Sequence, residues 1–395
     1  MPRAAAVAPW WQRLPEDFFR QADGTELDSE HRLKVAATAA VDRVLRSGLG
    51  IAVAAALGRG FLTPERIHEQ LRLMQPHEAL ADAGDSEAVF GRSRKGIHVE
   101  QLRPKVLSYR PFGVNYRLLR FDSDHRPLNP KLTERYDGAF NNRNAYAQYW
   151  SHGDRPRPTL ILVHGFGVDG YWFNAQMFSL RWFYKHGYDV LLYTMPFHGY
   201  RVEKGDWFSG YGLFANGLPC FNEGIVHAVR DLRVLLDFLE ARGVKQMGVS
   251  GLSLGGYTSA LLATVDPRLA FCIPNSPVVS IVDVAREWQP TGTLMALTLK
   301  RAGVTLAQLR HALAVHNPLS YAPKIDGDRV LIIGGAGDRF TPPRHVRLLH
   351  EHFQGSRLHW FPGNHLLHIQ QAQYLRLMKR FMDRCCGLRP WSKTD

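Results

Sequence analysis

The stretch GVSGLSLGGY, residues 248–257, places one serine between two glycines that lie two positions away on either side. The apolar run QMGVSG (246–251) leads into it as a buried strand would, and GGYTSALLATVD (255–266) follows it with the composition of a helix. A serine at so sharp a strand-to-helix turn is held with its hydroxyl outward, and its neighbours must be small to avoid the turn. The stretch therefore predicts a nucleophile at Ser253.

Strand-like and helix-like segments alternate on both sides of this turn. Two short strands are predicted in 106–121, apolar strands at 159–165, 189–196, 246–251, 271–277, 329–335 and 357–363, and helices at 172–186, 222–243, 255–266 and 368–386. Such alternation predicts an α/β fold with a mostly parallel central sheet that helices cover on both faces. In these sheets the reactive site lies at the carboxyl ends of the strands.

Two side chains downstream of Ser253 have the chemistry that a serine nucleophile needs. A hydroxyl is a weak nucleophile until a base takes its proton, and a histidine base needs a carboxylate to fix its tautomer. Asp338 follows the strand LIIGG, and His365 follows the strand RLHWF. We predict that Ser253, Asp338 and His365 form a catalytic triad. His368 is the rival base, and we expect it inside the final helix.

Backbone amides after another strand could stabilise the oxyanion of such a reaction. HGFG (164–167) follows TLILV, and its glycines leave the backbone open to a carbonyl oxygen. We predict an oxyanion hole made by the N–H groups of Phe166 and Leu254. His164 is expected to bond the loop backbone rather than act as a base.

The segments HGFG (164–167), GLSLG (251–255), GAGDRFTPP (335–343) and GNH (363–365) together resemble the four signature sites of the α/β-hydrolase superfamily, in order and at strand ends. The resemblance covers about residues 105–395 and implies a serine esterase or lipase-like member. MPFHGYR (195–201) also resembles a loop of esterase-like members, so that His198 is a candidate substrate-binding residue. The N-terminal segment departs from the family pattern.

The chain divides into two parts that differ in their sequence pattern. We expect an N-terminal helical extension over 1–95 and a catalytic domain over 96–395, with a helical cap at about 278–322. Trp288 and Met295 in the cap are candidates to contact an apolar substrate, although cap residues of this kind more often pack onto the body. The apolar window 49–58 is too short to span a bilayer.

Composition narrows the class of protein and its partners. The formal net charge of +13 is spread along 395 residues without a dense basic block, so we expect no nucleic-acid partner. Peripheral contact with a membrane through the N-terminal segment stays open. The four cysteines form no CxxC pair, which favours a reduced, cytoplasmic protein. We find no HExxH motif or carboxylate–histidine cluster, so no metal and no cofactor are expected. The oligomeric state stays open.

The leading functional hypothesis is a serine hydrolase that cleaves carboxylic esters through an acyl-enzyme, with a moderately apolar or lipid-like substrate. Three alternatives stay open: an acyltransferase with the same triad, a peptidase or amidase, and a non-catalytic binding protein on the same fold. A serine at position 253 argues against the superfamily reactions that use a carboxylate nucleophile.

Overall fold

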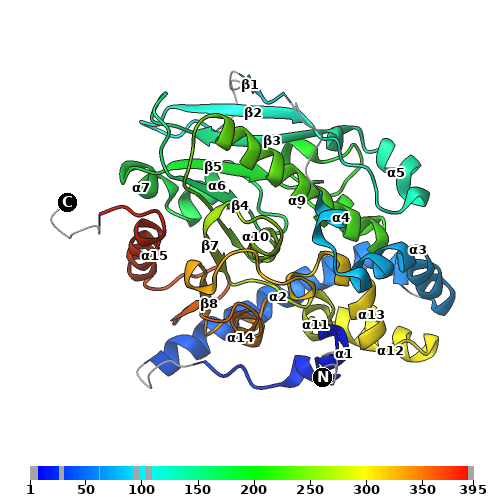
Figure 1. Cartoon of the computed structure of the whole chain (residues 1–395). Coiled ribbons are helices and arrows are strands. Elements are labelled where there is room, and N and C mark those ends of the chain that lie inside the picture. The colour runs from blue at the N-terminus through cyan, green and yellow to red at the C-terminus, as the bar shows by residue number, and fades with distance from the viewer. Residues whose placement is uncertain (1–7, 26–30, 62, 92–97, 103–108, 390–395) are drawn as a thin grey trace, which may run out of the picture.

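The protein is built around one nine-stranded sheet with the order β1-β2-β3-β5-β4-β6-β7-β8-β9 (Figure 1). The computed structural model describes residues 8–25, 31–61, 63–91, 98–102 and 109–389, with backbone alone for 49, 52–54 and 56–61. Strands β1 to β3 are antiparallel, β3 pairs with β5 antiparallel, and all later pairs are parallel. This mostly parallel sheet confirms the predicted fold class.

Each predicted parallel strand forms. The strands are β1 (Glu100–Leu102), β2 (Tyr116–Asp122), β3 (Asn144–Trp150), β4 (Thr159–Val163), β5 (Asp189–Thr194), β6 (Met247–Leu252), β7 (Leu269–Asn275), β8 (Leu331–Gly335) and β9 (Arg357–Phe361). Strand β3 was not predicted, because NAYAQYW mixes polar and aromatic residues without a clean apolar run. Part of the segment predicted as two short strands, residues 106–108, lies outside the described residues.

Helices cover both faces of the sheet, because successive strand residues point to opposite sides. In β4, Ile161 and Val163 join the core under α9 (Leu218–Ala241), α10 (Leu254–Val265) and α14 (Pro343–His352). Leu160 and Leu162 join a second core under α6 (Tyr171–Met177), α7 (Leu180–Lys185) and α15 (Gln371–Cys385). The predicted single helix over 172–186 is two short helices, because the chain breaks at Ser179, whose φ is 50°.

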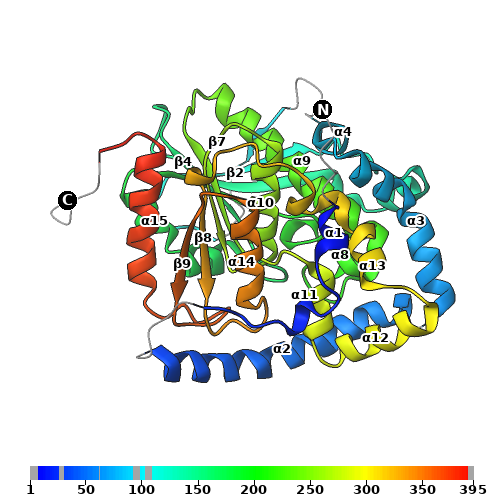
Figure 2. The ribbon, with the colours of Figure 1, turned by 60° about the horizontal axis from the view of Figure 1, so that its bottom comes forward.

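The N-terminal segment forms helices that pack against helices of the rest of the molecule. They are α1 (Trp10–Arg13), α2 (Arg32–Phe61), α3 (Pro64–Ala83) and α4 (Ser86–Phe90), followed within the predicted cap by α11 (Ile281–Glu287), α12 (Thr291–Ala302) and α13 (Leu306–Ala312). Figure 2 shows α2 along the edge to which the arrows of β8 and β9 point, beside α11 and α12. The predicted domain boundary at 95 lies outside the described residues.

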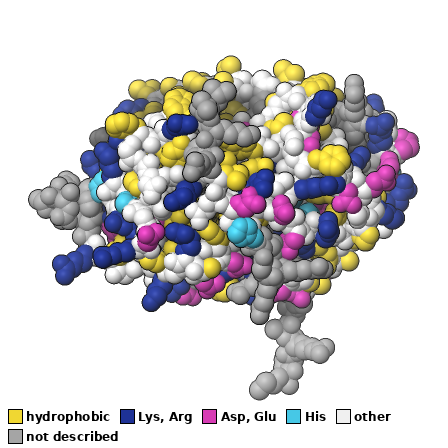
Figure 3. Space-filling view, turned by 90° about the horizontal axis from the view of Figure 1, so that it is seen from above, with side chains coloured by type: hydrophobic (Ala, Val, Ile, Leu, Met, Phe, Trp, Pro, Cys, Tyr) yellow, Lys and Arg dark blue, Asp and Glu magenta, His cyan; other side chains and the backbone are white. Residues whose placement is uncertain are grey.

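The charges on the surface and the apolar character of the helices concern the predicted nucleic-acid and membrane partners. On the face over β1 and β2, Figure 3 shows Lys and Arg mixed with Asp and Glu and with scattered apolar side chains. No described helix combines the length and apolar character that crossing a membrane requires.

Short helices complete the connections between the main elements. The 3₁₀ helices are Phe18–Arg20, Pro130–Leu132, Phe140–Arg143, Gly199–Arg201, Ala314–His316, Pro318–Ser320 and Gly327–Arg329, and the short α-helices are α5 (Thr133–Asp137) and α8 (Tyr211–Ala215).

Candidate active site

Ser253 occupies the sharp turn between β6 and α10. Its backbone has φ 58° and ψ −116°, a conformation that a non-glycine residue adopts at a cost of about 1–3 kcal/mol. The turn is fixed by a hydrogen bond from the Ser253 N–H to the Asn275 carbonyl, 3.0 Å. The side chain is half-buried. A strained residue persists only where its surroundings hold it, and such residues cluster at functional sites.

The two glycines that flank this turn are required by close approach. A Cβ at Gly251 would collide with the backbone of Gly255, and a Cβ at Gly255 would collide with the carbonyl of Val163. The start of α10 therefore lies directly against the ends of β6 and β4. This contact explains the glycine spacing from which the turn was predicted.

Asp338 and His365 meet at the ends of β8 and β9. The Nδ1 of His365 lies 2.7 Å from Asp338 Oδ2, and both side chains are almost fully buried. The other carboxylate oxygen accepts the N–H groups of Phe340 (2.9 Å) and Thr341 (2.8 Å), which fixes its orientation. With a proton on Nδ1 for Asp338, the Nε2 of His365 has a free lone pair, as a general base requires.

The electrostatics of this pair favour the protonated imidazole. Burial by itself lowers the pKa of His365, but the charge and hydrogen bond of Asp338, together with the charge of Asp42, outweigh burial, so the pKa is raised above 6.5. A carboxylate partner acts in this direction because it stabilises the positive charge. His365 can therefore accept a proton and hold it near neutral pH.

The link between Ser253 and His365 is open in this structure. Neither Ser253 Oγ nor His365 Nε2 has a hydrogen-bond partner among the described residues. The two loops nevertheless meet through Thr341, whose hydroxyl lies 3.2 Å from His365 Nδ1 and 3.0 Å from the Ser276 carbonyl. Ser276 follows Asn275, the residue that holds the Ser253 N–H. Nucleophile–base contacts are often loose without substrate.

His368 does not lie inside the final helix as expected, because α15 begins at Gln371. Its Nε2 lies 3.3 Å from the His365 carbonyl, and its Nδ1 contacts the Tyr374 hydroxyl. Burial is the main reason that its pKa is lowered to about 4. Both ring nitrogens are thus engaged, and the residue supports the loop that carries His365.

The backbone of the HGFG loop is oriented by His164. Its Nδ1 lies 2.8 Å from the Gly165 carbonyl, and its Nε2 accepts the N–H of Met195 at 3.0 Å. Because C=O and N–H of a trans peptide point in opposite directions, the Phe166 N–H points away from the His164 ring. The N–H of Leu254 is at the first position of α10, where helices leave donors unpaired. Neither of these two N–H groups has an acceptor among the described residues.

His198 is fully buried rather than exposed toward solvent. Its Nδ1 bonds the Pro196 carbonyl at 2.8 Å, and its ring packs edge-on against Phe166. Burial, then the nearby His164, lowers the pKa of His198 to about 3, so the ring is neutral near pH 7. Its contacts are with the HGFG loop, and a direct contact with substrate remains a prediction.

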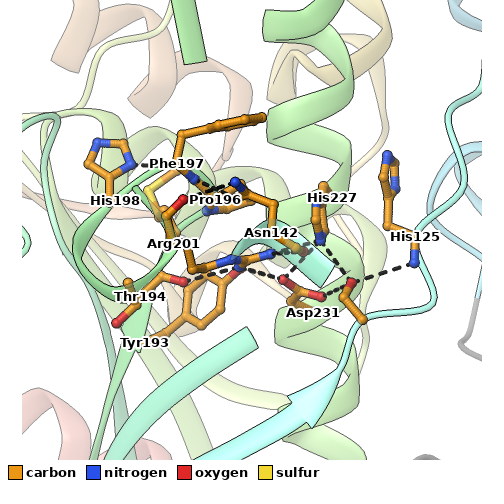
Figure 4. Close-up of polar contacts among 12 residues, drawn as sticks. His125, Asn142, Tyr193, Thr194, Pro196, Phe197, His198, Arg201, His227 and Asp231 are labelled. Carbon is orange, nitrogen blue, oxygen red and sulfur yellow. Dashed lines mark hydrogen bonds and ion pairs between the residues drawn. The ribbon is translucent and has the colours of Figure 1, made fainter. Parts of the chain in front are cut away.

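A buried polar network, which was not predicted, holds the loop of residues 195–201 that carries His198 (Figure 4). The guanidinium of Arg201 is fully buried and donates to Asp231 at 2.7 Å. Asn142 accepts the Phe197 N–H at 2.7 Å and donates to the Arg201 carbonyl at 2.9 Å. His198 lies on the other side of the loop from Asp231 in Figure 4. Such networks fix one backbone arrangement when their members are paired.

Within this network, Ser123, His227 and Asp231 form a second serine–histidine–aspartate group. The Ser123 hydroxyl donates directly to Asp231 Oδ1 at 2.6 Å, and Arg201 donates to His227 Nε2 at 2.8 Å. The histidine nitrogen nearest the serine is therefore occupied by a cation. Burial, followed by neighbouring positive groups, lowers the pKa of His227. Because Arg201 already donates to His227 Nε2, this nitrogen cannot take the proton of Ser123. The group is therefore structural.

Of the two predicted cap residues, Trp288 is linked to His365 through Phe340, whereas Met295 packs against the main core. Trp288 donates from Nε1 to the Phe340 carbonyl at 3.1 Å and packs edge-on against the Phe340 ring. Phe340 in turn stacks on His365, with ring centroids 5.1 Å apart. Met295 is half-buried and packs against the main core. Phe340 was not predicted as a site residue, although it lies two residues after Asp338 in the same motif.

In the described part of the chain, no group of three or more His, Cys, Asp or Glu is arranged to hold a metal ion.

Comparisons with known proteins agree with this architecture. Residues 146–284 match the family model described as alpha/beta hydrolase domain containing 18. The crystal structure of acetyl xylan esterase 1 from Thermoanaerobacterium sp. JW/SL YS485 matches with a TM-score of 0.57 and 17% identity, over 77% of this chain and 93% of that one. Acetyl xylan esterase from Paenibacillus sp. R4 gives 0.53 and 15%, over 78% and 94%. The chain thus has the α/β-hydrolase fold, which confirms the resemblance at that level.

In sequence, the chain is similar to uncharacterized proteins of two Mycobacterium tuberculosis strains, CDC 1551 and H37Rv. Each is 26% identical over 277 residues, which are 68% of this chain. The match spans 64% of the length of these relatives. Because both relatives are described as uncharacterized, they add no activity to what the fold shows.

Proposed function

We propose that the protein is a serine-dependent hydrolase of carboxylic esters. The observation that carries the proposal is the buried Asp338–His365 pair at the same sheet edge as the strained turn of Ser253. In the proposed reaction the Ser253 oxygen attacks the ester carbonyl while His365 Nε2 takes its proton. His365 then gives that proton to the leaving alcohol, and water releases the acyl group by the reverse sequence.

The other groups at the site have supporting roles in this proposal. Asp338 holds the His365 tautomer and stabilises the imidazolium through the 2.7 Å contact. The N–H groups of Phe166 and Leu254 would receive the oxyanion, and removal of one such donor typically slows turnover by about 10²–10³-fold. The aromatic contacts that link Trp288, Phe340 and His365 favour an ester with an apolar part. The two acetyl xylan esterases with the same fold support ester chemistry as the class.

Active-site labelling tests the proposal directly. Purified protein is expected to react with a fluorophosphonate probe at Ser253, and Ser253→Ala should abolish both labelling and turnover of chromogenic esters of graded acyl length. An exposed serine elsewhere, Ser47, gives the matched control, and Ser47→Ala should label as the wild type does. Labelling that survives in Ser253→Ala would place the nucleophile elsewhere. Turnover of amides faster than esters would make the protein an amidase or peptidase.

A further inference from the structure

Among the described side chains of α2, a line of apolar residues faces outward, the reverse of what a helix on a protein surface usually shows. Leu33, Val44 and Ile51 are 85%, 73% and 60% exposed. They are spaced by eleven and seven residues, so they lie along one line of the helix. Val41 and Leu45, each more than 40% exposed, widen this line. The opposite side of α2 is buried against the sheet edge.

Neighbouring elements extend this surface on both sides. Leu294 and Leu297 are exposed on α12, which is joined to α2 by a hydrogen bond from Thr291 to the Gly50 carbonyl. The loop after β9 is joined to α2 by a hydrogen bond from Asn364. Nine of the fifteen exposed large apolar side chains in the described part of the chain form what we call the apolar face: Leu33, Val41, Val44, Leu45, Ile51, Leu294, Leu297, Leu366 and Leu367.

The charges on α2 identify the partner that fits this face. The helix contains five basic residues and one acid, Asp42, which is fully buried. Arg32, Lys34 and Arg43 are exposed beside the apolar line. A second copy of α2 against the first would bring like charges together, which is unfavourable. Apolar side chains flanked by basic ones are typical of helices that lie on anionic lipid surfaces.

We propose that the apolar face docks onto an anionic lipid surface. Because α2 lies at the sheet edge where Ser253 and His365 lie, docking would bring that edge to the lipid. Leu366 and Leu367, directly after His365, belong to this apolar face and would lie near the lipid. The proposal concerns binding alone and does not depend on the proposed ester hydrolysis.

Vesicle co-sedimentation of the full chain tests this surface. Binding is expected to vesicles in which phosphatidylglycerol replaces part of the phosphatidylcholine, and to be weak with phosphatidylcholine alone. Val44→Glu should weaken binding by about tenfold or more, because an exposed apolar group becomes a charge. Arg43→Ala should weaken binding to the anionic vesicles by about fivefold and leave binding to the neutral ones unchanged.

Phe112→Glu is the matched control for Val44→Glu. Phe112 is 83% exposed in the loop before β2, which lies at the opposite edge of the molecule from α2 (Figure 1). This variant should bind as the wild type does. Absence of vesicle binding, or equal binding by Val44→Glu, would overturn the proposal. If light scattering showed a dimer that Val44→Glu dissociates, the face would be an interface between copies of the chain instead.

The inner face of α2 carries an independent observation. Asp42 Oδ2 accepts the N–H of Arg339 at 2.9 Å and the N–H of His365 at 3.1 Å. One carboxylate oxygen therefore joins the loop of Asp338 to the loop of His365. The other oxygen, Oδ1, is buried without a partner among the described residues. Arg46, one turn along α2, donates to the Arg339 carbonyl at 2.6 Å and reinforces the same contact.

From this bridge we infer that Asp42 is a positioning residue for the His365–Asp338 pair, an inference that rests on the proposed function. Its ionisable neighbours are Asp338, Arg339 and His365 in the loops and Arg46 on α2. Burial first, then the charge of Asp338, raises the pKa of Asp42 to about 6. Above that pH its negative charge helps to stabilise the His365 imidazolium.

Two variants separate the charge of Asp42 from its hydrogen bonds. Asp42→Asn keeps an acceptor oxygen but removes the charge, so the pKa of His365 should fall and the acidic limb of the pH profile of kcat/KM should move to lower pH. Asp42→Ala leaves two buried N–H groups without an acceptor, and kcat should fall by about 10–100-fold. Asp82→Asn, on α3, is the control and should change neither quantity.

The ring pKa of His365 is also measured by NMR titration, assigned with His365→Ala, so that a failure of the ester hypothesis does not hide the result. An unchanged His365 pKa in Asp42→Asn would overturn the positioning role. A wild-type protein without ester turnover, but with the expected shift, would instead contradict the proposed function alone.

Discussion

At the scale of single residues, the chemistry depends on which nitrogen of which histidine is free. His365 uses Nδ1 on Asp338 and has no partner for Nε2 among the described residues. His368 has contacts at both ring nitrogens. His164 is buried in the loop that carries Phe166, and His198 is buried in the loop after β5, with its ring against Phe166. Burial lowers the pKa of His164, His198 and His368, whereas the Asp338 carboxylate raises that of His365. His365 is therefore the histidine suited to act as the base.

These differences predict a pH profile. Only the neutral ring accepts a proton, so kcat/KM should rise with pH through an apparent pKa above 6.5 and be lost as the pH falls below it. His365→Ala should lower kcat by about 10⁴-fold or more. His368→Ala should lower it by less than about tenfold and keep the same profile. Rates of a non-ionising ester across pH measure all three, and the opposite ranking of the two variants would assign the base to His368.

At the scale of elements, a buried ion pair ties the N-terminal segment to α11 and α13. Arg310 on α13 is fully buried and pairs with Asp283 on α11 at 2.6 Å. The same guanidinium donates to the carbonyls of Leu14 (2.5 Å) and Pro15 (2.9 Å), just after α1. One side chain thus joins three segments. Removal of one partner from such a pair leaves a buried charge uncompensated.

Arg310→Ala should therefore lower the free energy of unfolding by about 3–5 kcal/mol, measured by urea denaturation. Arg310→Met combined with Asp283→Leu should recover much of that loss, because neither charge is then left unpaired. Arg301→Ala, which changes an exposed arginine at the end of α12, should stay within about 0.5 kcal/mol of the wild type. Equal destabilisation by Arg310→Ala and Arg301→Ala would contradict the role of the pair.

At the scale of the whole molecule, the N-terminal segment is part of the folded body. Trp10, Trp11 and Phe18 are buried, the first two in the main core. Arg344, on α14, donates to Asp23 at 2.6 Å and to the Phe19 carbonyl at 2.8 Å. Deletion of this segment would expose core surface and remove backbone acceptors from Arg310 and Arg344. Exposed single side chains of α2 are therefore the better probes of its outward face.

Much of the fold followed from local pattern. The runs TLILV and DVLLYT, and the glycines around Ser253, depend on burial and close approach, which short stretches of sequence record directly. The strand β3 could not be predicted, because its pairing with β2 and β5 rather than its own composition makes it a strand. The burial of His198 likewise depends on distant neighbours.

The sequence by itself determined the turn of Ser253, the order of the parallel strands along the chain and the two candidates, Asp338 and His365, that follow β8 and β9. Only the tertiary structure decided that Asp338 and His365 meet at 2.7 Å and that Asp42, about 300 residues away in the chain, joins their loops. The physical reason is how far apart in the chain the interacting residues lie. Turn chemistry acts between near neighbours, whereas a contact between a helix and two loops exists only once the sheet has brought their ends together.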